Sequence, residues 1–199
     1  MKTVSFVIAC GALLMAGCQA EPRSSPNSIF GAEDPVTLIV SDVAPSDSEK
    51  AKLLAAKEML FQKLSGRLMQ AMSQIGPAGA IKVCQSEAKT IASDVGMEAN
   101  VRIGRTGVRL RNASNTSPAW AQQLVADRTE TAVFAKLSND HAAALLPIKL
   151  QSQCLMCHGP KEQLAPEVTD ELAKLYPQDQ ATGFSEGELR GWFWIELLD

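Results

Sequence analysis

This chain has no large excess of positive or negative charge, few aromatic side chains and only two histidines. Its 199 residues carry 19 basic and 22 acidic side chains, a net charge of −3, and only 5% of them are aromatic. There is no run of lysine or arginine that could follow a phosphate backbone, so nothing favours a nucleic-acid partner. With 46% hydrophobic residues, the chain is long enough to bury the core of one domain.

Long hydrophobic runs are also absent, apart from one at the N-terminus. The first 17 residues join a basic Lys2 to an apolar stretch from Val4 to Ala16. This stretch is too short and wrongly flanked for a spanning helix, so residues 1–17 are predicted to be a secretory signal peptide. The rest of the chain is therefore expected in an oxidising compartment.

The end of this segment resembles a bacterial lipobox. Ala16 and Gly17 stand directly before Cys18, although Met15 occupies the position where leucine is usual. We expect Cys18 to become a lipid-modified N-terminus; the alternative is an ordinary signal peptide that is cleaved nearby. Gln19 then favours sorting to the outer membrane. The expected location is the periplasmic side of the cell envelope, with the lipid as the only membrane anchor.

Cysteine is too scarce in the mature chain to build a disulfide framework. Of the five cysteines, Cys10 leaves with the signal peptide and Cys18 carries the lipid, so that Cys84, Cys154 and Cys157 remain. Three thiols cannot all pair as disulfides, so in an oxidising compartment we expect them to bind another group.

Proline, serine and aspartate are concentrated in residues 18–48. We interpret this segment as a flexible tether that starts at the lipidated cysteine, with a possible short strand at Val36–Val40. The folded domain is expected over residues 49–199.

Two helices are predicted at the start of this domain. Ser46 and Glu49 form the sequence pattern of a capping box, and apolar residues follow at helical spacing as far as Gly76-Pro77. A second helix is expected from there to Val95, with Gly96 as its C-terminal stop.

Short strands and helices are predicted after these two helices. Val101 and Ile103 alternate in one phase and Val108 and Leu110 in the opposite phase, which predicts a bulge or turn at Gly104–Gly107. Helices followed by strands with interspersed helices predict an α+β fold with an antiparallel sheet. The other expected elements are a helix over 117–127, two strands around a Ser-Asn-Asp turn within 131–150, a helix over 166–176 and a strand over 189–197.

The sequence CLMCH at residues 154–158 places two thiols and an imidazole in one turn of chain. Attachment of c-type haem needs two thiols at the spacing of two vinyl groups and a histidine that binds iron from the same side; Cys154, Cys157 and His158 supply these. A zinc site would need four ligands, to which Cys84 could contribute. A redox-active dithiol would be expected in a thioredoxin-like βαβ unit, which the antiparallel pattern does not predict. Haem c is therefore the favoured cofactor, with zinc and a dithiol as alternatives.

The ligand on the other side of the iron stays open from the residues alone. The candidates are Cys84, His141, a methionine, water or no ligand. Cys84 is an unpaired thiol on an alanine-lined helix face, against which a flat ring could lie. The alternative is a buried structural cysteine, a frequent place for this residue type.

Four segments carry a resemblance to a known family: AIKVCQSEA, RIGRTGVRLRNASN, CLMCHG and YPQDQATGFSEGELRGWFWIEL. In this order they resemble the Tll0287-like haem domain family, over about residues 49–199. The resemblance implies a PAS-like α+β domain with long N-terminal helices and covalently bound c-type haem. It also implies that Cys154 and Cys157 hold the haem and that His158 and Cys84 are its axial ligands.

The arginine-rich segment of this resemblance offers partners for the two carboxylates of haem. A guanidinium pairs with a carboxylate through two parallel hydrogen bonds. Arg105 is the first candidate for a haem propionate and Arg109 the second; the alternative for each is a solvated strand face. Gly107 and Ala113 depart from the family pattern, where serine and proline are usual, in the loop beside the haem and not at its ligands.

An iron with two axial protein ligands has no vacant position for a substrate, so we expect no enzyme. The expected function is electron transfer at low potential with an unknown redox protein. The alternative is a redox or gas sensor that loses its thiolate ligand and signals through a separate partner.

Overall fold

The computed structural model describes residues 37–40 and 42–198. The expected signal peptide, the lipid-bearing Cys18 and the first part of the expected tether lie outside these residues. Within them, no helix has the apolar length that crossing a bilayer requires.

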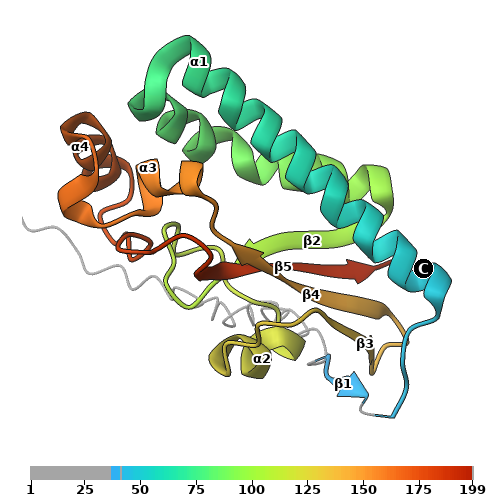
Figure 1. Cartoon of the computed structure of the whole chain (residues 1–199). Coiled ribbons are helices and arrows are strands. Elements are labelled where there is room, and N and C mark those ends of the chain that lie inside the picture. The colour runs from blue at the N-terminus through green and yellow to red at the C-terminus, as the bar shows by residue number, and fades with distance from the viewer. Residues whose placement is uncertain (1–36, 41, 199) are drawn as a thin grey trace, which may run out of the picture. The chain divides into compact units, whose positions relative to one another are not determined.

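A five-stranded sheet forms the centre of the described fold (Figure 1). The strands lie in the order β1-β3-β4-β5-β2, and every neighbouring pair is antiparallel. The predicted α+β class with an antiparallel sheet is therefore confirmed. Because β1 pairs with β3, the end of the segment expected as a tether belongs to the sheet. The strands are β1 (Ile39–Val40), β2 (Val101–Thr106), β3 (Val133–Leu137), β4 (Ala142–Lys149) and β5 (Leu189–Leu197).

One long helix, α1 (Asp47–Ala99), crosses the sheet and turns back on itself at Gly76 (Figure 1). At its start the Ser46 hydroxyl accepts from the N–H of Glu49, and the Glu49 carboxylate accepts from the N–H of Ser46. Gly76 has φ 70° and ψ 180°, which favours glycine, and Pro77 opens the second half. The break predicted at this pair of residues is therefore confirmed. The two halves are joined by the ion pairs Arg67–Glu87 and Lys63–Glu98.

The second half of α1 ends at Asn100, so the prediction that Gly96 stops the helix was wrong. Asn100 adopts the left-handed conformation with φ 51°, and its side-chain amide donates to the carbonyl of Leu198 at 2.9 Å. A Cβ at Gly96 would lie 2.9 Å from the carbonyl oxygen of Val101. The glycine is therefore required for close packing of the helix against β2, and asparagine supplies the terminating conformation.

Strand β2 runs as far as Thr106 without the bulge predicted at Gly104–Gly107, and the chain leaves the sheet at Gly107. Its pairing with β5 runs without a break from Val101 opposite Leu197 to Thr106 opposite Trp192. Within β2, a Cβ at Gly104 would lie 2.5 Å from the Trp194 ring, so a small residue is needed there. The change of phase arises because the chain leaves the sheet after Thr106, and Val108 and Leu110 lie outside the strand.

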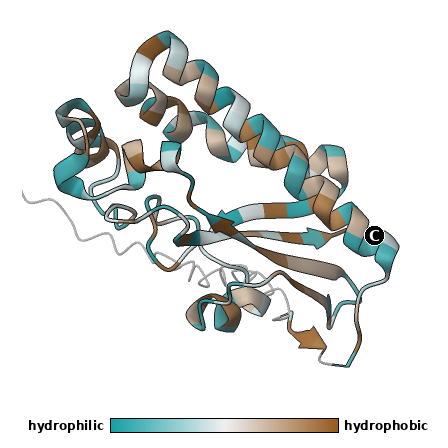
Figure 2. Ribbon diagram, in the orientation of Figure 1, coloured by the Kyte–Doolittle hydropathy of each residue, from teal (hydrophilic) through white to brown (hydrophobic). Residues whose placement is uncertain are grey.

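Hydrophobic side chains pack on both faces of the sheet. On one face, Leu60 and Val95 of α1 pack with Phe193 and Ile195 of β5. On the other face, Trp192 is buried with Trp120, Ala121, Val125 and Leu145 beneath a short helical segment. Figure 2 shows hydrophobic residues along β4 and alternating with hydrophilic ones along α1. The short segment consists of η1 (Ala119–Ala121) and α2 (Gln122–Ala126), as predicted for residues 117–127.

Between β4 and β5 the chain forms several short helices before it returns to the sheet. The last of them packs against α1, since Val168 and Leu172 are buried with Ile81. The predicted helix over 166–176 is confirmed. These elements are η2 (Ser152–Cys154), α3 (Leu155–His158), η3 (Lys161–Gln163) and α4 (Pro166–Leu175).

Candidate functional site

The C-x-x-C-H segment forms a tight helical turn just after β4. Cys154 ends η2, whereas Cys157 and His158 lie in α3. The N–H of Gly159 donates to the carbonyl of Leu155 at 2.8 Å, and a Cβ at Gly159 would lie only 2.6 Å from that oxygen. A glycine is therefore needed directly after the histidine. Both motif cysteines are half-buried free thiols.

His158 is held by one ring nitrogen. Its Nδ1 lies 2.6 Å from the carbonyl oxygen of Ala181. Because a carbonyl oxygen only accepts, Nδ1 carries the proton and Nε2 keeps its lone pair. Burial, together with the positive charges of Arg111 and Arg190, lowers the pKa of His158 to about 3. The imidazole is therefore neutral near pH 7, which is the form that binds a metal ion.

Cys84, on the second half of α1, shares the surroundings of this turn. It is accessible to solvent, yet partial burial raises the pKa of its thiol, and the charges of Arg105 and Arg111 oppose that rise. Burial also raises the pKa of Cys157, and the charge of Cys84 adds to this effect. Ile81, three positions before Cys84 on α1, belongs to the buried cluster against which Cys157 packs. The fold therefore brings this stretch of α1 to the cysteine motif.

Arg105 lies on the face of β2 that packs toward α1. Burial lowers the pKa of its guanidinium, whereas the charges of Cys84 and Tyr176 raise it. Arg105 forms no hydrogen bond or ion pair with residues 37–40 or 42–198. By contrast, Arg102 on the opposite face is largely exposed and pairs with Glu196 at 3.6 Å. The solvated-face alternative thus describes Arg102 and not Arg105.

Arg109 binds the loop that precedes β5. Its Nε donates to the carbonyl of Gln180 at 3.1 Å and its Nη2 to that of Thr182. The guanidinium stacks 3.8 Å from the ring centre of Phe184 and lies 3.7 Å from a carboxylate oxygen of Glu188. The side chain of Arg109 is therefore held mainly by residues 180–188.

Arg111 belongs to the site, although the sequence analysis did not select it from its segment. Its Nη2 donates to the carbonyls of Cys157 at 2.5 Å and Ala181 at 3.2 Å, and its Nε donates to Asp179 at 3.1 Å. The spacing of the arginines does not distinguish Arg111 from Arg109. The contacts of Arg111 with Asp179 and Ala181 come from a loop about 70 residues further along the chain, which the spacing does not reveal.

Arg190, near the start of β5, was also missed. Its Nη1 donates to the carbonyl of Arg109 at 3.0 Å, whereas its buried Nε has no hydrogen-bond partner among residues 37–40 and 42–198. Burial, with the nearby charges of Arg111 and Arg105, lowers the pKa of Arg190 to about 10. A buried cation among other cations with an unused donor is costly unless an anion is nearby. The sequence signal that could have indicated Arg190 was its position before Gly191 in the segment YPQDQATGFSEGELRGWFWIEL, which carries the family resemblance.

The other candidates from the sequence lie elsewhere. His141 is at the turn between β3 and β4, where its Nδ1 lies 3.1 Å from Glu196. In the part of the chain that the structure describes, no three His, Cys, Asp or Glu side chains form a group that could hold a metal ion. The alternative of a four-ligand zinc site therefore finds no assembled ligand set there.

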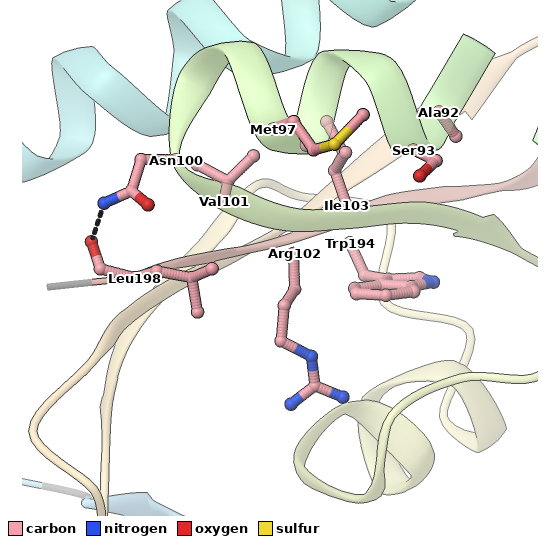
Figure 3. A pocket seen from close by; sticks show the side chains of 10 residues that line it. Ala92, Ser93, Met97, Asn100, Val101, Arg102, Ile103, Trp194 and Leu198 are labelled. Atoms are coloured by element: carbon pink, nitrogen blue, oxygen red, sulfur yellow. Dashed lines mark hydrogen bonds between the residues drawn. The ribbon is translucent and has the colours of Figure 1, made fainter. Parts of the chain in front are cut away.

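Two open grooves are separate from the cysteine motif. One, of about 560 Å³, lies between the second half of α1, β2 and the end of β5. Figure 3 shows Met97 on the helix side of β2 and the side chains of Arg102 and Trp194 on the other side. The other, of about 530 Å³, is bounded by residues 108–113 and 177–180. Neither is lined by Cys84 or by the motif.

Comparison with known proteins gives the family of this chain and a solved structure with a similar fold. The Tll0287-like family matches residues 41–197. Among solved structures, the chain is similar to the crystal structure of the cyanobacterial heme-protein Tll0287, with a TM-score of 0.57 and 21% sequence identity over 77% of this chain and 96% of that one. No curated protein matches the chain. Because the family match spans most of the sequence, this chain belongs to the Tll0287-like family.

Proposed function

We propose that this protein carries haem c on Cys154 and Cys157 and transfers electrons, with His158 and Cys84 as the axial ligands of iron. The observation that supports it most is the packing of Cys157 against the cluster around Ile81, which brings the part of α1 that carries Cys84 to the C-x-x-C-H turn. The name of the solved structure with the same fold, a heme-protein, points the same way.

The donor set fits an iron porphyrin. Cys154 and Cys157 are free, half-buried thiols at the spacing that thioether attachment needs. His158 presents a neutral Nε2, and the nearby charges of Arg105 and Arg111 favour the thiolate form of Cys84. When bound, haem would supply one-electron redox chemistry.

The arginines fit the two carboxylates that haem carries. Arg105 has no partner within the described part of the chain, and Arg190 has a buried Nε without one. An anionic group would satisfy both. Arg109 is the weaker candidate, because it would have to give up a contact with Gln180 or Thr182 to bind a propionate.

Two axial ligands from the protein favour electron transfer over catalysis, because neither side of the iron would be open to a substrate. The proposal includes a lipid anchor at Cys18, the periplasmic side of the envelope and an unidentified redox protein as partner. Sensing through a separate partner is the second candidate, because Cys84 is accessible to solvent and could leave the iron. A PAS-like domain could report the resulting movement.

The test uses the full chain matured in a host that attaches c-type haem. We expect the intact mass to include one haem, and the ferric protein to give the optical and EPR spectra of low-spin iron with a thiolate ligand. Replacing both motif cysteines by serine should abolish the added mass. Cys84→Ser should keep the added mass but change the spin state, whereas Ser86→Ala, two positions along the same helix, should change neither.

Three results would contradict parts of this proposal. A mature protein without added haem would refute the function as a whole. An unchanged spectrum in Cys84→Ser would remove Cys84 from the ligand set. Stoichiometric binding of carbon monoxide to the reduced protein, with loss of the thiolate signature, would favour sensing over electron transfer.

A further inference from the structure

Arg111 connects the two chain segments that hold His158. Its Nη2 donates both to the carbonyl of Cys157, the residue before the histidine, and to the carbonyl of Ala181, the acceptor of the histidine Nδ1–H. The acceptor peptide is fixed at its other end too, because the N–H of Ala181 donates to Asp179 Oδ1 at 2.7 Å. Asp179 Oδ2 accepts from Arg111 Nε at 3.1 Å and closes the network.

The same two segments are joined by backbone hydrogen bonds. The N–H of Gly183 donates to the carbonyl of Gly159 at 2.7 Å, and the N–H of Phe184 to that of His158 at 2.9 Å. The Phe184 ring meets the imidazole edge-on at 84°. Arg111 is the positively charged member of this assembly, paired with the carboxylate of Asp179, and its side chain is only 14% exposed. Its charge is therefore weakly screened at the imidazole.

We propose that Arg111, paired with Asp179, is a positioning residue for His158: it orients the imidazole through the carbonyl of Ala181 and sets how strongly Nε2 donates to a bound iron. This deepens the proposed function and rests on it for the iron. The orienting effect of Arg111 on the imidazole does not depend on iron, because it is argued only from the hydrogen bonds described above.

The direction of each effect follows from charge. Arg111 shares the Ala181 carbonyl with His158, which weakens that oxygen as an acceptor for Nδ1–H and makes the imidazole a poorer electron donor. Loss of Arg111 should strengthen ligand donation and remove a positive charge, and both changes favour ferric iron. Arg111→Gln should therefore lower the reduction potential. Asp179→Asn leaves the Arg111 charge uncompensated and should raise it.

The experiment compares mature full-length proteins by three measurements: intact mass, reduction potential and the ¹⁵N–¹H NMR signals of His158 in the diamagnetic state. Wild type should show a proton on Nδ1 with slow solvent exchange. In Arg111→Gln this exchange should become several-fold faster, because the acceptor carbonyl is no longer fixed, and the potential should fall. Arg111→Lys keeps the charge but loses the planar fork, so its potential should stay near wild type while the exchange still quickens.

Arg102→Gln is the matched control, since it removes an arginine charge from the same segment on the opposite, largely exposed face of β2, where Arg102 pairs with Glu196 and not with the loop that holds His158. It should leave the potential and the Nδ1–H exchange unchanged. The positioning role would be overturned if Arg111→Gln and Asp179→Asn fold and keep the wild-type reduction potential and the wild-type Nδ1–H exchange of His158. If wild type carries no haem, the proposed function fails, and the NMR measurement still decides whether Arg111 orients His158. If Arg111→Gln does not fold, Arg111→Lys and Asp179→Asn decide.

Discussion

Replacing Asp179 by alanine should destabilise the protein strongly for a residue in a loop. The Asp179 carboxylate makes two contacts: it pairs with Arg111 at 3.1 Å and accepts the N–H of Ala181 at 2.7 Å. The two paired side chains are only 10% and 14% exposed. Solvent therefore cannot easily replace either contact once the carboxylate is gone.

The cost can be worked out from these contacts. Removing one partner of a buried ion pair costs about 3–5 kcal/mol, because the other charge stays buried alone. Arg111 keeps two carbonyl acceptors, so we take roughly 2–3 kcal/mol here. The unpaired N–H of Ala181 adds about 1 kcal/mol. Asp179→Ala should thus cost about 3–4 kcal/mol, and Asp179→Asn about 1 kcal/mol less, since asparagine keeps an oxygen for that N–H.

Urea denaturation of the mature protein at pH 7, followed by circular dichroism, measures these free energies of unfolding. A double-mutant cycle of Asp179→Ala with Arg111→Ala should give a coupling of about 2 kcal/mol. The control Glu130→Ala breaks the exposed pair with Lys149, at 2.9 Å, and should cost less than about 0.5 kcal/mol. A cost for Asp179→Ala no greater than that control, or additive single changes, would refute the reasoning.

Two further predictions concern the ends of α1. Asn100→Gly should cost about 1 kcal/mol in thermal or urea unfolding, because the side-chain hydrogen bond to Leu198 is lost while glycine tolerates the left-handed backbone. Asn100→Ala should cost about 1–2 kcal/mol, because it also strains that backbone, and equal costs would contradict this. The hydrogen bond from Lys136, with those from Ser46, lowers the pKa of Glu49 from 4.5 to about 2. The ionised carboxylate thus stabilises the folded state above pH 4.5, and this contribution is lost as the pH falls towards 2. Glu49→Gln should flatten the decline of stability in that range, and an unchanged acid limb would argue against the assignment.

Local sequence signals predicted the elements of the fold, because capping and turn formation depend on residues a few positions apart. The Ser46–Glu49 capping box and the break at Gly76-Pro77 are of this kind. The turn between β3 and β4 is another. Glycine was the least informative signal, since Gly96 serves a close approach to Val101 and not the end of a helix. Whether a glycine ends a helix or allows close packing depends on which strand lies against it, and the local sequence does not show this.

The cysteine motif was also readable locally, since Cys154, Cys157 and His158 lie in one turn of chain. The sequence singled out Cys84 as an unpaired thiol, and the resemblance supplied its role as a ligand. Only the tertiary structure brought the part of α1 that carries Cys84 to the motif, through the packing of Cys157 against the cluster around Ile81. The proposed ligation itself awaits the spectra described above.

The sequence by itself determined the class of fold, the order of its elements and the haem-type motif, because each depends on short spacings. The tertiary structure decided which arginine does what. Among the described residues Arg105 has no hydrogen-bond or ion-pair partner, and Arg109 binds the loop before β5. Arg111 donates to the carbonyl of Ala181, which also accepts from His158. All three belong to one short basic segment, and they differ because their partners lie far along the chain, where spacing carries no information.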